Sequence, residues 1–168
     1  MSNPTCRNPR DSVGWRCGSC GQLITSIGDG WVEWLALEDV SGASVLRGVR
    51  LVHSGTARGR APDYSCRYDY RKEFRNNAGI VEGLALERFA GPDGLMLLLS
   101  FIATGEFSTN DILELAKRVQ VPRYELSREI FPQAIACQAF TPFLGEGYYL
   151  QSEMKELLTW TAEEPKTP

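Results

Sequence analysis

The chain has 168 residues, of which 43% are hydrophobic and 23% are charged, and its formal net charge is −3. These values are ordinary for a soluble globular protein with a hydrophobic core. No stretch reaches the roughly 20 apolar residues that span a bilayer, and the first residues contain no apolar segment of the kind found in secretory signals. We therefore expect a cytoplasmic protein with no membrane partner, in which thiols stay reduced.

The first motif along the chain is the stretch "WRCGSCGQLI", which places Cys17 and Cys20 three positions apart. This spacing occurs in redox pairs, in haem attachment sites and in metal sites. A redox pair opens a helix, but no helical pattern follows Cys20, and haem attachment needs a histidine where Gly21 stands. The pair therefore favours one half of a metal site, with glycines supplying the freedom that its turn requires.

Two predicted strands follow, at residues 31–38 and 45–54, and a turn between them indicates an antiparallel hairpin. The returning strand ends near His53, the only histidine, and Cys66 comes 12 residues later. Folding the hairpin returns the chain to the cysteine pair, so we expect Cys17, Cys20, His53 and Cys66 to bind one zinc ion. The alternatives are a ligand role for Cys6 in place of one of them, a surface histidine, and a Cys66 that is only a small buried apolar residue.

A structural role for this zinc follows from the size of the segment and the number of ligands. Residues 14–78 are rich in turns and glycine, and a core that small rarely stabilises itself. Structural zinc contributes roughly 10–16 kcal/mol in zinc-finger peptides. Four protein ligands also leave no open position for a catalytic water.

The second half of the chain has apolar residues at helical spacing. A short helix is expected in residues 64–77, and a connector with another short helix before residue 93. The helix after this connector is expected to be buried and to end at Gly105, and Cys137 is expected in the core. Further predicted elements are a helix opening at Ser108, one opening at Pro122 that Pro132 kinks or restarts, an extended hairpin at 139–151 and an amphipathic helix at 152–160.

The two halves also differ in charge. Residues 1–78 hold 11 Lys and Arg against 8 Asp and Glu, whereas residues 79–168 hold 7 against 13. We therefore expect an α+β protein in which an N-terminal zinc-bound β-hairpin module packs on a C-terminal helical half. The expected segments are a flexible arm (1–13), the zinc-binding β module (14–78), a helical domain (79–161) and a tail (162–168).

The motif "CGSCGQLI", the strand "WVEW" and the pair His53 and Cys66 together resemble the zinc-ribbon and treble-clef-like group of small zinc modules. The layout also resembles small bacterial proteins that carry a CxxC motif near the start, a "GPDGL" stretch mid-chain (91–95) and a "GYY-Q" stretch near the end (147–151). This likeness implies a zinc-stabilised fold and does not imply an activity.

Three functions remain open from the sequence. The first is a non-catalytic protein-interaction adaptor or regulator, which the acidic helical half and the aromatic residues Tyr148 and Tyr149 would serve. The second is nucleic-acid binding, in which a basic stretch interleaved with tyrosines contacts phosphates. The cations of that stretch are Arg47, Arg50, Arg58, Arg60, Arg67, Arg71, Lys72 and Arg75.

The helices followed by an expected hairpin also allow a winged-helix interpretation of the C-terminal half, although Glu125 and Glu129 offset the cations of the would-be recognition helix.

The third function is catalysis, which is the least favoured. The sequence has no phosphate-binding loop, nucleophile elbow or HExxH motif. If His53 binds zinc, the commonest general base is also taken.

Overall fold

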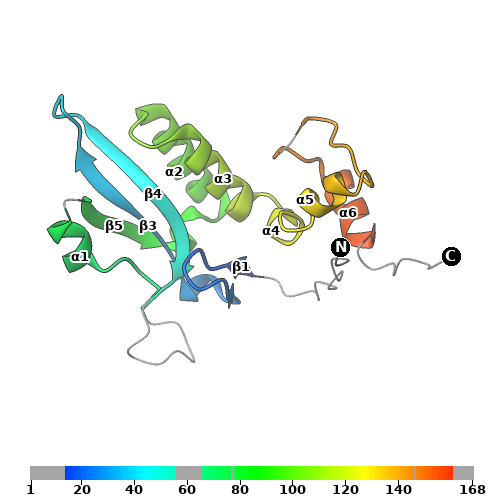
Figure 1. Ribbon diagram of the computed structural model, residues 1–168, viewed down its shortest axis with the longest axis horizontal. Coiled ribbons are helices and arrows are strands. Elements are labelled where there is room, and N and C mark those ends of the chain that lie inside the picture. Colours follow the sequence, from blue (N-terminus) through cyan, green and yellow to red (C-terminus); the bar gives the residue numbers. More distant parts are fainter. Residues whose placement is uncertain (1–13, 56–65, 77, 146, 161–168) are drawn as a thin grey trace, which may run out of the picture. The chain divides into compact units, whose positions relative to one another are not determined.

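The structure is a computed structural model that describes residues 14–55, 66–76, 78–145 and 147–160. The chain forms two compact units, the first being Gly14–Gln120 and the second taking in the chain from Val121 onward. Antiparallel strands dominate the N-terminal part and helices the C-terminal part, which confirms the expected α+β class (Figure 1). Within the described residues, no helix is long and apolar enough to cross a membrane.

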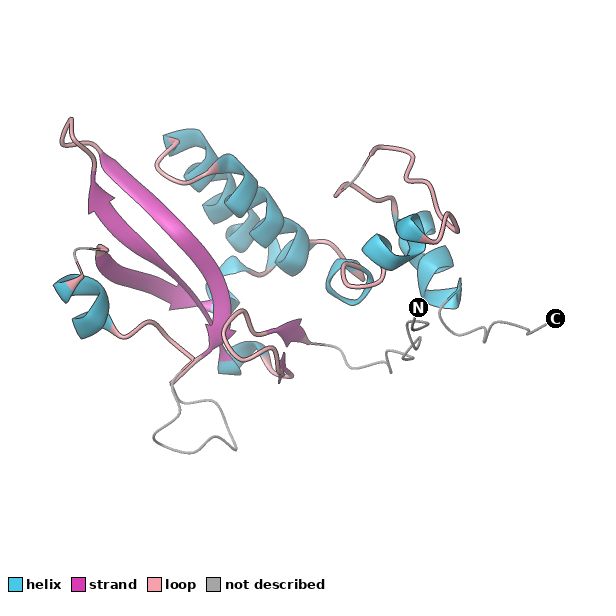
Figure 2. Ribbon diagram, viewed as in Figure 1, coloured by secondary structure: helices cyan, strands magenta, loops and turns pink. Residues whose placement is uncertain are grey.

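Two antiparallel sheets build the first unit (Figure 2). A small sheet pairs β1 (Trp15–Arg16) with β2 (Leu23–Ile24). The larger sheet has the order β4-β3-β5, formed by β3 (Gly30–Glu38), β4 (Ser44–His53) and β5 (Ile80–Ala85). The predicted hairpin is confirmed, because β3 and β4 pair antiparallel with Gly30 opposite His53. Short 3-10 helices precede β3 (Ile27–Asp29) and follow β5 (Leu86–Phe89).

The turn between β3 and β4 is held by Asp39. Its carboxylate accepts hydrogen bonds from the Ser41 hydroxyl at 2.6 Å and from the amides of Ser41 and Ala43 at 2.7 and 3.0 Å. These donors, the Ser41 hydroxyl above all, hold the pKa of Asp39 below its ordinary value. A carboxylate that accepts several local donors is a recurrent way of closing a turn.

Helices cover one face of the larger sheet. α2 (Gly91–Thr104) and α3 (Thr109–Gln120) supply Leu98, Ile112 and Leu115 to the same core as the strands. Trp34 of β3 meets Phe101 and Phe107 edge to face, with ring centroids 5.9 and 5.4 Å apart. The short helix α1 (Tyr70–Arg75), capped by the Asp69 carboxylate, precedes β5.

The second unit consists of α4 (Tyr124–Ser127), α5 (Phe131–Ala136) and α6 (Gln151–Trp160) with the loops between them. Its core includes Phe131, Met154 and Leu157, and Tyr149 stacks on Phe131. No strand forms in the described residues between α5 and α6, so the expected hairpin at 139–151 is wrong and the wing of a winged helix is missing there.

The structure corrects three further expectations. The connector after residue 79 contains β5, a strand whose alternation is interrupted by Gly83 and which becomes clear only through its pairing with β3. α2 is not a buried helix, because Leu95, Met96 and Leu99 are exposed. Cys137 is exposed rather than in the core.

The division between compact units also lies elsewhere than the change in composition near residue 79. β5 pairs with β3, and α2 and α3 pack on the sheet, so residues 80–120 complete the first unit. The helical part of the sequence is thereby shared between the two units.

Candidate metal centre

The cysteine pair lies in the tight loop between β1 and β2. The Cys17 amide donates to the Gln22 carbonyl at 2.9 Å, and the Gly21 amide donates to the Cys17 carbonyl at 3.0 Å. Gly21 has φ +70°, a left-handed conformation that glycine adopts without a steric cost. The Ser19 amide points at the Cys17 sulfur, 3.4 Å away, which is the arrangement that stabilises a thiolate.

The loop is attached to the returning strand of the hairpin, because the Gly18 amide donates to the Leu51 carbonyl at 2.8 Å. Two residues further along β4, His53 ends the strand. Its Nδ1 lies 3.6 Å from the Cys20 sulfur and 3.8 Å from the Cys66 sulfur, while Nε2 lies 3.3 Å from the Leu23 carbonyl oxygen. When Nε2–H donates to this carbonyl, Nδ1 keeps its lone pair for a metal ion.

The structure brings all four predicted ligands together. Their donor atoms lie within 4.8 Å of one another, and Cys17, His53 and Cys66 are buried. In a regular tetrahedral site, bonds of about 2.3 Å to sulfur and 2.0 Å to nitrogen place a sulfur and a nitrogen about 3.5 Å apart and two sulfurs about 3.8 Å apart. The two sulfur–nitrogen distances, 3.6 and 3.8 Å, are close to this geometry, so the Cys3His cluster can hold a metal ion. Cys6, the alternative ligand, lies outside the described residues.

Cys66 comes from a loop on the sheet face opposite α2 and α3, and a buried carboxylate fixes this loop. Glu33 of β3 is 0% exposed. Its Oε1 accepts from Arg50 Nε at 2.8 Å and from the Tyr68 amide at 2.9 Å. Arg50 Nη2 in turn donates to the Cys66 carbonyl at 3.3 Å. Glu33 and Arg50 therefore hold the backbone on both sides of Arg67, next to the fourth ligand.

The same polar cluster includes aromatic rings. The Arg50 guanidinium lies 3.5 Å from the centre of the Tyr68 ring, and the Arg67 guanidinium lies 4.4 Å from that of Trp31. Burial raises the pKa of Tyr68, whose hydroxyl donates to the Gly48 carbonyl at 3.1 Å. The sequence analysis missed Glu33, although a glutamate inside the apolar run "WVEWL" is the signal that could have found it.

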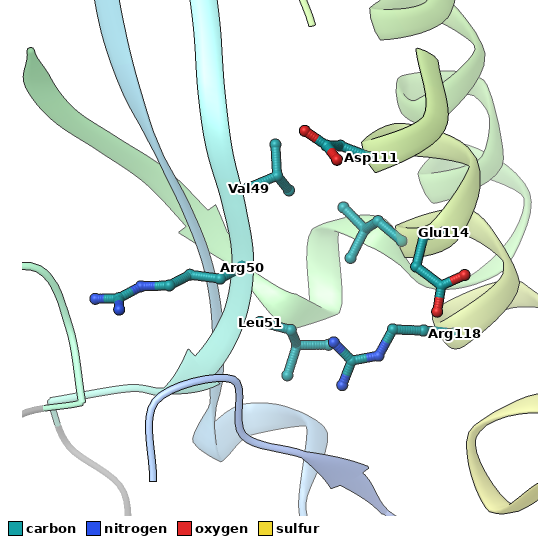
Figure 3. A pocket seen from close by; sticks show the side chains of 7 residues that line it. Val49, Arg50, Leu51, Asp111, Glu114 and Arg118 are labelled. Atoms are coloured by element: carbon teal, nitrogen blue, oxygen red, sulfur yellow. The ribbon is translucent and has the colours of Figure 1, made fainter. Parts of the chain in front are cut away.

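Helix α3 holds the cysteine loop from the other side. Trp15 Nε1 donates to the Arg118 carbonyl at 3.1 Å, and Arg118 Nη2 donates to the Arg16 carbonyl at 2.6 Å. Figure 3 shows Val49 and Leu51 pointing toward α3, whereas Arg50 points away from it. The hollow between β4 and α3 has a volume of about 80 Å³, well below the roughly 300–1,000 Å³ of small-molecule sites.

Two of the described cations of the basic stretch pair with a buried carboxylate. Arg50 and Arg67 turn toward Glu33, with Arg67 Nε 3.7 Å from Glu33 Oε2. Arg47 is exposed on β4, and the exposed cations of α1 are Arg71, Lys72 and Arg75. The remaining two of the eight predicted phosphate contacts, Arg58 and Arg60, lie outside the described residues.

Comparison with known proteins adds no relative. The chain matches no protein-family model, no curated protein and no solved structure. The function of the chain is therefore inferred from the residues of the site and of the surface.

Proposed function

We propose that the Cys3His cluster binds one zinc ion in a structural role, and that the chain is a non-catalytic binding or regulatory protein that acts as a protein-interaction adaptor. The observation that carries the first part is the convergence of three sulfurs and one imidazole nitrogen. Sulfur-rich tetrahedral sites select zinc or iron–sulfur chemistry, and a single closed set of four donors suits one zinc ion.

Several features support a structural rather than a catalytic zinc. Four protein donors leave no coordination position for water or substrate. The ligands come from the β1–β2 loop, the end of β4 and the segment before α1, so the ion would join three parts of the chain that are far apart in sequence. The ligand His53 also has its second nitrogen engaged by a backbone carbonyl, as orienting partners of metal ligands commonly are.

A binding role is supported by the surface of the described residues. Large apolar side chains are exposed on both compact units, among them Phe74, Met96 and Phe143. Exposed apolar side chains gathered into patches mark interaction sites on soluble proteins. A zinc-held sheet would present such side chains on a rigid support, which lowers the entropic cost of binding.

Metal content measured by elemental analysis tests the zinc proposal. We expect one zinc per chain in the wild type, a lower content in Cys66→Ser, and an unchanged content in Cys137→Ser, the matched control with an exposed thiol outside the cluster. Iron in place of zinc, or full occupancy in Cys66→Ser, would contradict the proposed ligand set. Full zinc occupancy in Cys66→Ser together with loss of zinc in Cys6→Ser would identify Cys6 as the fourth ligand.

Nucleic-acid binding is the second candidate, and the exposed cations of α1 beside Tyr70 and Phe74 are the observation that favours it. A mobility shift with single-stranded and double-stranded oligonucleotides that weakens with added salt would support this function. No shift at low salt would eliminate it, because phosphate contacts are strongest there.

A further inference from the structure

Exposed aromatic and aliphatic side chains gather around α1. Tyr70 and Phe74 lie one helical turn apart, and they are 62% and 73% exposed. Ile80, at the start of β5, is 61% exposed. We call these three side chains, with Leu37 of β3, the α1 patch. Large side chains exposed this far leave most of their apolar area in water, so covering them would release the free energy of apolar burial.

Phe74 lines two hollows of this patch. One has a volume of about 520 Å³ and is lined by residues of α1 alone, namely Tyr70, Arg71, Phe74 and Arg75. The other has a volume of about 290 Å³ and is lined by residues of β3, α1 and β5 and by Gly79 just before β5, namely Ala36, Leu37, Glu38, Phe74, Gly79 and Ile80. A partner that contacts the Phe74 side chain would therefore reach both hollows.

The two hollows differ in charge. Arg71 and Arg75 line the first, and Lys72 is exposed on the same helix. Among the described residues, no carboxylate lies within ion-pair distance of these three cations. Arg71 Nε donates to the Tyr70 hydroxyl at 2.9 Å, which orients both side chains. The second hollow lies between the apolar side chains of Leu37, Phe74 and Ile80 and has Glu38, the one charged residue of its lining, at its border.

This division indicates the chemistry of the partner. Cations without a carboxylate partner attract acidic groups, while the hollow between Leu37, Phe74 and Ile80 can take an aliphatic or aromatic side chain. A nucleic acid fits less well, because the Glu38 carboxylate at the border of the second hollow repels phosphate. Tyr, Arg and Phe are also the residue types enriched at the centres of protein interfaces.

We propose that the α1 patch binds a peptide segment of another protein in which an apolar residue is adjacent to acidic residues. The apolar side chain enters the hollow formed by Leu37, Phe74 and Ile80, and the carboxylates pair with Arg71 and Arg75. This inference rests on the proposed protein-interaction function and specifies its surface and partner class.

A random-peptide phage library selected on the full-length, zinc-loaded protein tests the inference. We expect enriched peptides to place Asp or Glu next to Leu, Ile or Phe. Synthetic peptides of the enriched sequence are then titrated, by fluorescence anisotropy, into the wild type and three variants. Phe74→Ala and the charge reversal Arg71→Glu are expected to weaken binding about 10-fold or more, as loss of a central interface residue does.

Met96→Ala is the matched control, because Met96 is 65% exposed on α2, outside the patch. It is expected to leave the affinity unchanged, and circular dichroism checks that every variant is folded. Enriched peptides that bind Phe74→Ala as tightly as the wild type would overturn the α1 patch and leave the adaptor function standing. If no peptide is enriched and Arg71→Glu abolishes a salt-dependent oligonucleotide shift, both the α1 patch as a peptide site and the adaptor function are overturned.

Discussion

Replacing Glu33 by glutamine is the sharpest test of how the sheet supports the metal centre. Glutamine keeps the shape of the side chain and one carbonyl acceptor, but it removes the charge that faces Arg50 and Arg67. Hydrogen bonds to a charged group stabilise by about 1 kcal/mol more than neutral ones. Glu33 Oε1 accepts hydrogen bonds from Arg50 Nε and from the Tyr68 amide and forms an ion pair with Arg50 Nη2 at 2.7 Å, so the loss from these three charged contacts is about 3 kcal/mol before solvent is considered.

Water reduces this loss, because the Arg50 side chain is 25% exposed. We therefore expect Glu33→Gln to destabilise the first unit by about 2 kcal/mol, which lowers its melting temperature by about 8 °C. Because Arg50 and Tyr68 fix the backbone beside Cys66, metal affinity should also fall by about 10- to 100-fold, the usual cost of losing a partner that orients a ligand.

The assay combines thermal melts by circular dichroism with competition for zinc against a chromophoric chelator. Leu98→Ala is the matched control, because Leu98 is buried on the opposite, helical face of the sheet. It should cost about 2–5 kcal/mol of stability while leaving zinc affinity unchanged. The reasoning is refuted if Glu33→Gln keeps wild-type zinc affinity, or if both variants lose affinity equally.

Three further predictions follow from the same structure. Removing the metal with a chelator should abolish hydrogen-exchange protection in β1, β2 and the end of β4 while protection in α6 persists; equal loss in α6 would contradict a local role for the ion. Because the pKa of Asp39 is lowered in the folded state, its carboxylate stabilises the folded protein above the ordinary pKa value of 3.8, and this stabilisation is lost as the pH falls through the folded-state pKa. The melting temperature of Asp39→Asn, measured in acid, should therefore depend less on pH than that of the wild type. Gly94→Ala should destabilise by about 1–3 kcal/mol in urea titrations, because its methyl group would lie against the Phe89 backbone, and a wild-type midpoint would show that α2 packs less closely there.

Much of the metal centre could be predicted from the sequence. A CxxC pair flanked by glycines, one histidine at the end of a returning strand and a later cysteine leave few other arrangements in a hairpin. The strands at 30–38 and 44–53 and their antiparallel pairing were predictable for the same reason, since β-forming residues alternate with turn signals at their ends. Local patterns of this kind depend only on residues close together in the sequence, so they can be recognised before the fold is known.

Other features depended on contacts between distant segments. β5 is short and contains Gly83, whose missing side chain leaves room for the Val32 carbonyl and the Trp31 ring, and only pairing with β3 reveals it as a strand. The apolar face of α2 gave no sign that Met96 would be exposed, because periodicity reports that a helix has an apolar face and not what covers it.

The amino-acid sequence by itself determined the ligand types, the hairpin that returns them to one place and the α+β class, because spacing and local propensity act over short distances. Only the tertiary structure decided that Glu33 binds Arg50 and Arg67, which removes two cations from the basic stretch and leaves those of α1 on the surface beside Phe74. The physical reason is that a buried carboxylate is costly unless cationic and hydrogen-bonding groups contact it, and the fold can bring those groups from any position in the sequence.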